Sequence, residues 1–297
     1  MKFPIKKKNI IIIVLVTIIL FINSCHASLL EPKGEIAVNQ KKIMLFSLGM
    51  MLLIVIPVII MTFWFIIKYR KSNIKSKYTP NWSYSRNIEL LVWIIPILII
   101  FCLSIVAYTT THRLEPSKPL ISKIKPIKIN VIALDWKWLF IYPKYRIATI
   151  NEISFPKNVP VQFKITSNSV MNSFFIPSLG SQIYAMPCMS TTLNLIANSS
   201  GKYKGMSSNY SGKNFSNMKF SVLITKDNSS FISWINKVKK NGISLYNKEK
   251  YLKHIFKPDE NYKVQYFFDI DDTIFNKLIQ SCYLKPNNNI NNNYKKN

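Results

Sequence analysis

Two long apolar segments constrain this chain more than any other feature. Residues 43–67 form a run of 25 residues without a charged side chain, and residues 88–110 are equally apolar apart from Glu89. An α-helix rises about 1.5 Å per residue, so the first run reaches about 37 Å, enough to span a bilayer with tilt. Pro57 and Pro96 lie inside the runs, where a neighbouring helix can satisfy the freed backbone groups. The sequence therefore predicts two transmembrane helices.

Residues 1–24 are interpreted as a signal peptide. Three lysines precede an apolar run over residues 10–22, which is shorter than the roughly 20 residues that a transmembrane helix needs. The run ends in Ile22-Asn-Ser-Cys25, which is similar to the lipobox of bacterial lipoproteins although Asn is unusual at its second position. We expect lipidation of Cys25, with residues 25–42 outside the plasma membrane. The alternative is an ordinary signal peptide followed by an incidental cysteine.

The segment between the two apolar runs indicates their orientation. Residues 68–87 contain six basic side chains and no acidic one, and such loops stay in the cytoplasm. Basic flanks elsewhere weaken this argument, but the signal peptide independently places residue 26 onward outside. Both observations predict a helical hairpin with residues 111–297 on the periplasmic side of a bacterial inner membrane.

The formal charge of +27 first suggests nucleic-acid binding, but the residue types argue against it. Only four of the forty basic residues are Arg, whereas readers of phosphates and base edges favour the guanidinium group. The lysines are spread along the chain among abundant Asn and Ile, which share AT-rich codons, so we attribute most of the charge to compositional drift. A hydrophobic content of 48% also excludes a disordered basic protein.

Residues 111–225 are predicted to be a β-rich periplasmic domain, because short runs of Ile, Val, Phe and Tyr alternate with Pro, Gly and Asn. Residues 226–285 have apolar side chains at helical spacing, including Phe231, Trp234, Ile235 and Val238, and predict two or three amphipathic helices. Residues 286–297 have too little apolar content to pack and are expected to be disordered. The predicted strands are 127–134, 138–142, 147–153, 161–166, 191–197 and 219–225.

The β-rich domain has few groups that could catalyse a reaction. Residues 116–226 contain no His, and their only carboxylates and thiol are Asp135, Glu152 and Cys188. A Ser-His-Asp triad, a carboxylate pair or a transition-metal site cannot be assembled from this set. The acidic run 269–272 lacks the Gly and Glu of a calcium loop, so we interpret it as a solvated helix start. Cys188 and Cys282 either pair in the oxidising periplasm or remain separate thiols.

Several long motifs give the chain a specific resemblance to a known family. Over residues 25–225, and more loosely to about 284, it resembles subunit 2 of the cytochrome bo-type ubiquinol oxidases, within the haem-copper oxidase subunit II family. The motifs are Glu31-Pro-Lys-Gly34, Lys77-Tyr-Thr-Pro-Asn-Trp-Ser83, Thr111-His-Arg-Leu-Glu-Pro-Ser-Lys-Pro119, Asp135-Trp-Lys-Trp138 with Tyr142-Pro143, and Thr166-Ser-Asn-Ser-Val-Met-Asn-Ser-Phe-Phe-Ile-Pro177. The resemblance implies a two-helix transmembrane hairpin, a periplasmic cupredoxin-like β-barrel or sandwich, and a short helical C-terminal segment.

The resemblance implies a comparison with the cytochrome c oxidase relatives, in which the outer domain holds a dinuclear copper centre. Its ligand positions fall here on side chains that do not suit copper, because hydroxyl and amide groups are hard neutral donors and a phenyl ring offers no lone pair. We therefore expect no metal in this chain. The six positions are Asn172, Ser207, Asn209, Ser211, Phe215 and Met218, of which Met218 alone keeps the family's ligand type.

The expected loss of copper determines the electron donor. Without an outer copper centre the chain resembles the quinol oxidase branch, in which ubiquinol rather than cytochrome c supplies electrons through subunit I. The resemblance places the haem and copper cofactors, the oxygen reduction and the main partner surface in subunit I. Trp136 matches a tryptophan that accepts electrons in the copper-bearing relatives, and here we expect it to be a packed aromatic residue.

Glu89 carries the sharpest site hypothesis. A carboxylate inside an apolar run is costly and commonly functional. The resemblance puts this position near the entrance of a proton channel into subunit I. The alternative is an interfacial Glu paired with Arg86, three residues earlier on the same helical face.

The sequence therefore predicts a subunit of a proton-pumping ubiquinol oxidase that is not catalytic by itself. Two other classes stay open: a membrane-tethered scaffold that captures a periplasmic partner, and a copper-bearing cytochrome c oxidase subunit.

Overall fold

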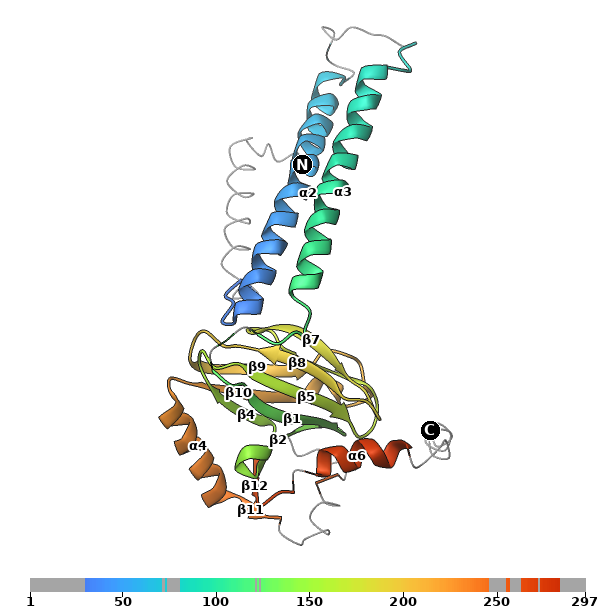
Figure 1. Ribbon diagram of the computed structural model, residues 1–297. Helices are drawn as coiled ribbons and strands as arrows, with labels where there is room; N and C mark the ends of the chain where they lie inside the picture. Colours follow the sequence, from blue (N-terminus) through green and yellow to red (C-terminus); the bar gives the residue numbers. More distant parts are fainter. Residues whose placement is uncertain are drawn as a thin grey trace, which may run out of the picture. The chain divides into compact units, whose positions relative to one another are not determined.

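The computed structural model describes residues 30–70, 73, 81–120, 122, 124–245, 255–256, 263–271 and 273–283. For residues 281–283 it describes the backbone alone. The proposed signal peptide, Cys25 and the tail 286–297 lie outside these residues. The chain divides into two compact units, one of residues 39–118 and one that combines the segment before residue 39 with everything from Pro119 onward. Figure 1 shows the helices of the first unit and the strands of the second.

Two long apolar helices make up most of the first unit. Helix α2 spans Glu35–Lys68 and helix α3 spans Arg86–Arg113, and both are long and apolar enough to cross a membrane. Helix α2 begins eight residues before the predicted span, because Glu35 and the polar residues after it continue the helix ahead of the apolar run. Acidic side chains occupy the first turn of each helix and basic ones the last turn, as the helix dipole favours.

The second unit is built on two β-sheets (Figure 1). The larger sheet has the spatial order β11 (Ile243–Ser244), β12 (Gln265–Phe268), β3 (Ile147–Ile150), β2 (Lys137–Tyr142), β1 (Ile127–Leu134), β5 (Val161–Ser167) and β8 (Thr191–Leu195). The smaller sheet has the order β4 (Glu152–Pro156), β10 (Lys219–Thr225), β9 (Gly201–Ser207), β6 (Asn172–Ile176) and β7 (Gly180–Ala185).

The chain passes from one sheet to the other at Asn151. This residue has φ +57°, a left-handed conformation that Asn adopts more readily than most residues. Its side chain accepts a hydrogen bond from the Trp138 amide at 2.9 Å, and its carbonyl accepts one from Ser221 at 2.9 Å. The predicted single strand 147–153 is therefore two strands, β3 and β4, in different sheets.

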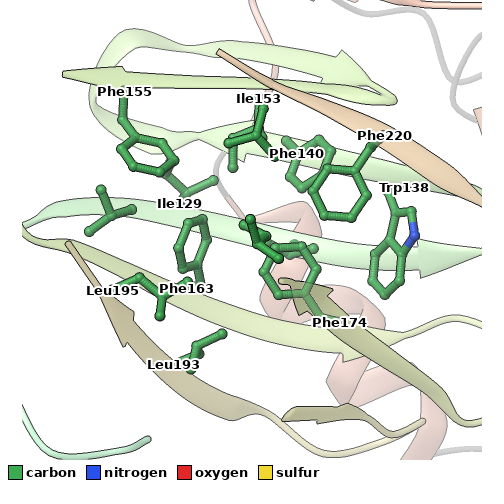
Figure 2. Close-up of a cluster of buried hydrophobic side chains, with 14 of the residues drawn as sticks. Ile129, Trp138, Phe140, Ile153, Phe155, Phe163, Phe174, Leu193, Leu195 and Phe220 are labelled. Atoms are coloured by element: carbon green, nitrogen blue, oxygen red, sulfur yellow. The ribbon is translucent and has the colours of Figure 1, made fainter. Parts of the chain in front are cut away.

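The main core fills the space between the sheets (Figure 2). Alternate residues of most of the strands supply it, as the period of two predicts. Phe174 and Phe220 stack with their ring centroids 5.1 Å apart and planes at 7°, and Trp138 meets both rings edge-on. Figure 2 shows Phe155, Phe163, Leu193 and Leu195 completing the cluster.

A second core covers the opposite face of the larger sheet. Ile132 and Leu134 of β1 and Leu139 and Ile141 of β2 point away from the main core and pack with Phe275 of helix α6 (Ile274–Tyr283). Strands β1 and β2 are thus buried on both faces, which explains their nearly continuous apolar sequences.

The C-terminal segment combines helices with strands. Helix α4 (Asn228–Asn241) buries Phe231, Trp234, Ile235 and Val238, as the helical spacing predicts. Strand β12 then pairs antiparallel with β3, and β11 pairs with β12, so the prediction of helices alone was wrong here. A strand of four residues is too short to show a recognisable alternation of apolar and polar residues, so only its pairing with β3 identifies it. Strands β6, β7 and β9 were also missed.

Candidate functional site

The positions that match copper ligands gather at one end of the smaller sheet. Asn172 begins β6, Ser207 ends β9, and Met218 directly precedes β10. The Ser207 hydroxyl donates to Asn172 Oδ1 at 3.3 Å, and the Ser207 amide donates to the Met218 carbonyl at 3.0 Å. All three residues are at least 90% buried. The sheet register therefore brings these positions together as the resemblance implies.

The loop after Ser207 carries the remaining positions. The side-chain Nδ2 of Asn209 donates to the carbonyls of Met171 and Tyr210, both at 3.4 Å. The Phe215 ring meets the Tyr210 ring edge-on, with centroids 5.0 Å apart. The Ser211 hydroxyl is buried and has no hydrogen-bond partner among the described residues.

The chemistry of this site does not fit a pair of copper ions. Its donors are amides, hydroxyls and one thioether, and soft thiolates and imidazoles are missing from the matched positions. Several of the donors are already engaged with one another. In the part of the chain that the structure describes, no group of three or more His, Cys, Asp or Glu side chains could hold a metal ion.

Trp136 packs against the same loop. It forms the β1–β2 turn with φ +64°, and its ring lies over Gly212, where an added Cβ would come within 2.7 Å of Trp136 Cη2. Gly212 itself has φ +119°, which disfavours any other residue. The indole is therefore in close contact with the loop that follows Ser207.

Sequence reasoning missed two polar clusters. At the start of the loop, the Ser208 hydroxyl donates to Ser173 Oγ at 2.8 Å and to Gln182 Oε1 at 2.6 Å. On β4, Glu152 Oε1 accepts hydrogen bonds from Trp234 Nε1 at 3.0 Å and from the Tyr266 hydroxyl at 2.7 Å. Burial and the adjacent Glu152 carboxylate raise the pKa of Tyr266. These partners lie 82 and 114 residues from Glu152, so no local sequence signal could reveal them.

Glu89 lies in the first turn of α3 and is exposed in the isolated chain. Its alternative interpretation was an ion pair with Arg86. The structure describes both residues and contains no ion pair between them. The Glu89 carboxylate thus has no ion-pair partner among the described residues.

The acidic run near residue 270 belongs to a helix start. Asp271 accepts hydrogen bonds from the Thr273 amide at 2.9 Å and the Thr273 hydroxyl at 2.6 Å, just before α6. These bonds lower the pKa of Asp271 to about 2. Asp269 is instead 3.8 Å from Arg146 Nη2, so the two carboxylates of the run that the structure describes have separate partners.

Known proteins are similar to this chain over most of its length. Residues 141–225 match the family model described as cytochrome c oxidase subunit II, periplasmic domain. The chain is 51% identical over 279 residues to cytochrome bo(3) ubiquinol oxidase subunit 2 of Buchnera aphidicola, covering 94% of this chain and 97% of that protein. It is 50% identical to the protein of that name from Pseudomonas putida, covering 88% and 82%.

The chain belongs to the ubiquinol oxidase subunit 2 family. A solved structure, the periplasmic domain of cytochrome oxidase subunit II from Bradyrhizobium japonicum, matches with a TM-score of 0.38 and 23% identity, covering 41% of this chain and 98% of that one. Membership confirms the recognised family and the predicted architecture of two apolar helices, a β-sandwich and a C-terminal helix. The chain is thus a membrane-anchored subunit of a multi-subunit haem-copper oxidase.

Proposed function

We propose that this chain is a non-redox subunit of a proton-pumping ubiquinol oxidase in the bacterial inner membrane, with its β-domain in the periplasm. It carries no copper of its own. Haem and copper in subunit I reduce oxygen, and ubiquinol, not cytochrome c, supplies the electrons to that subunit. The role of this chain is to cover the periplasmic side of subunit I, to stabilise the assembled complex and to frame a proton-uptake path.

The donor set at the former ligand positions carries this proposal. Ser207 and Asn172 hydrogen-bond to each other, and Phe215 packs on Tyr210, so these groups serve the packing of the loop. A neutral hydroxyl cannot replace a bridging thiolate at pH 7. With no electron acceptor on this side, a soluble cytochrome has nothing to reduce.

Glu89 supplies the proton-uptake part of the proposal. Its carboxylate has no ion pair with Arg86 and sits in the first turn of an apolar helix, where the cytoplasm meets the membrane in the predicted orientation. A carboxylate at this position can take a proton from water and release it to a group in subunit I.

Lipidation of Cys25 is the remaining part. The lipobox-like sequence ends at Cys25, five residues before the first described residue, Leu30. A thioether-linked lipid there would anchor the mature N-terminus in the outer leaflet, in addition to the two helices.

Purification of the complex through a tag on this chain tests the proposal. We expect haem-bearing subunits in the preparation, oxygen uptake with ubiquinol, none with reduced cytochrome c, and copper in the amount that subunit I alone requires. Elution of this chain without haem would support the tethered scaffold instead. Two additional coppers per complex, or cytochrome c oxidation, would support the copper-bearing class.

A further inference from the structure

Cys188 is disulfide-bonded and lies in the loop between β7 and β8. The sequence has four cysteines, and Cys102 on α3 is a free thiol. Because the structure is that of a single chain, the partner of Cys188 is Cys25 or Cys282. Neither of these side chains is among the described ones, so the choice rests on the placement of the segments that carry them.

The Cys188 loop lies at the end of the larger sheet where β1 and β5 finish. The Ser167 amide donates to the Met186 carbonyl at 3.3 Å, and Ser167 forms a bridge with Pro187. Ser167 in turn is the register partner of Ala133. The loop is therefore two strand spacings, or about 10 Å, from the end of β1.

Helix α6 contributes to the second core, and this core reaches the same end of β1. Leu134, the last residue of β1, belongs to the second core together with Phe275, against which Leu278 and Ile279 also pack. Residue 282 lies in the last turn of α6, one turn beyond Leu278. The helix that carries Cys282 thus belongs to a core that extends to the end of β1 nearest the Cys188 loop.

The segment that follows Cys25 docks at the other end of the strands. Lys33 accepts a hydrogen bond from the Asn198 amide at 2.7 Å, and Gly34 forms a bridge with Ala197. Ala197 follows Leu195, the partner of Val161 at the start of β5, and Val161 is about 20 Å along that strand from Ser167. Lipidation would in addition occupy the Cys25 sulfur.

We propose that Cys188 and Cys282 form a disulfide that fastens the last turn of α6 to the β7–β8 loop. The exclusion of Cys25 rests in part on the lipid anchor proposed above. In forming the bond, two thiols lose two protons and two electrons, and an oxidised dithiol carrier of the periplasm accepts the electrons by thiol–disulfide exchange. The bond would hold the C-terminal segment over the second core.

Peptide mapping of the purified complex tests the pairing. Free thiols are blocked with N-ethylmaleimide under denaturing conditions, the chain is digested without reduction, and cross-linked peptides are identified by mass spectrometry. We expect a peptide pair joining Cys188 to Cys282 and a labelled Cys102. Labelling of Cys188 or Cys282 in most of the wild-type molecules would overturn the inference.

The same map separates this inference from the lipid anchor. A lipid-modified Cys25 peptide together with labelled Cys188 and Cys282 would leave the anchor intact and refute the disulfide. A link between Cys188 and Cys25 would refute both. On a non-reducing gel, the variants Cys188→Ser and Cys282→Ser should each lose the faster mobility of the cross-linked chain, whereas the control Cys102→Ser should retain it.

Discussion

At the scale of single residues, the carboxylates of this chain divide into those with partners and those without. Glu152 binds two aromatic side chains from the C-terminal segment, and Asp271 shapes the start of α6. Glu89 has no ion-pair partner among the described residues and lies in an apolar helix. A costly group without a structural partner is the better candidate for a function in the complex.

The substitution Glu89→Gln removes the ionisable group and keeps the size of the side chain. If Glu89 takes up protons, turnover of ubiquinol should fall about 100-fold, at the lower end of what proton-transfer groups contribute. Haem content and subunit composition should stay normal. Oxygen-uptake rates measure the effect, and Glu115→Gln, an exposed carboxylate beyond the end of α3, is the control. Unchanged turnover would remove the proton role.

Deletion of one hydroxyl in the Glu152 cluster should loosen β12. Tyr266→Phe removes the 2.7 Å hydrogen bond to the carboxylate, and bonds to charged groups contribute about 1.5 kcal/mol each. The amides of β12 should then exchange with solvent about tenfold faster. Tyr210→Phe is the matched control, because Tyr210 is 72% exposed and its ring contact needs no hydroxyl. Equal exchange in both variants would contradict the prediction.

At the scale of secondary-structure elements, the first turn of α2 belongs to the β-domain. Ile36 and Ala37 are 6% and 5% exposed, and the Ala37 amide donates to the Leu179 carbonyl at 3.2 Å. A Cβ at Gly34 would lie 2.7 Å from the Leu179 oxygen, a contact that real Cβ atoms do not make. Glycine is therefore required where the backbones meet.

Gly34→Ala should separate the start of α2 from the β-domain. The added Cβ would clash with backbone atoms, which cannot move aside as a flexible side chain can. We therefore expect the free energy of unfolding of the domain to fall by about 2 kcal/mol, as at overpacked sites. Gly49→Ala within α2 is the control, because a Cβ there meets nothing within 4 Å and Ala favours a helix. Thermal unfolding of the purified protein should separate the variants; equal melting temperatures would disprove the tight contact.

At the scale of the whole molecule, the β-domain has two cores on opposite faces of one sheet. The main core lies between the sheets, and the second lies under the segment that follows Thr225. The family model ends at residue 225, so the second core depends on a segment outside it. The C-terminal segment is therefore part of the fold.

Truncation after Thr225 should expose Ile132, Leu134, Leu139 and Ile141 together. Full burial of such a side chain is worth about 2 kcal/mol, so the exposed face should bind a hydrophobic dye and reduce assembly with the other subunits. Removal of residues 286–297 is the control and should change neither property. Normal assembly of the chain truncated after Thr225 would show that the second core is dispensable.

The extent of prediction from sequence follows the strength of the local patterns. The strands at 127–134 and 219–225 were predicted with their observed bounds, because apolar residues recur there with clear turn signals. Strand β9 was missed because its sequence, Gly201-Lys-Tyr-Lys-Gly-Met-Ser207, has two glycines and two lysines, and its partners β10 and β6 supply the order. At the candidate site, motif spacing identified the positions, whereas their mutual hydrogen bonds required the sheet register.

The sequence by itself determined the two apolar helices, the β-rich domain, the family and the chemical types at the positions that match copper ligands. These properties depend on composition and short-range periodicity, which a chain carries whether or not it is folded. The tertiary structure alone decided the switch between sheets at Asn151, the addition of β12 to the edge at β3, and the convergence of Trp234 and Tyr266 on Glu152. Each of these joins segments far apart in the chain, and such contacts arise only when packing brings the segments together.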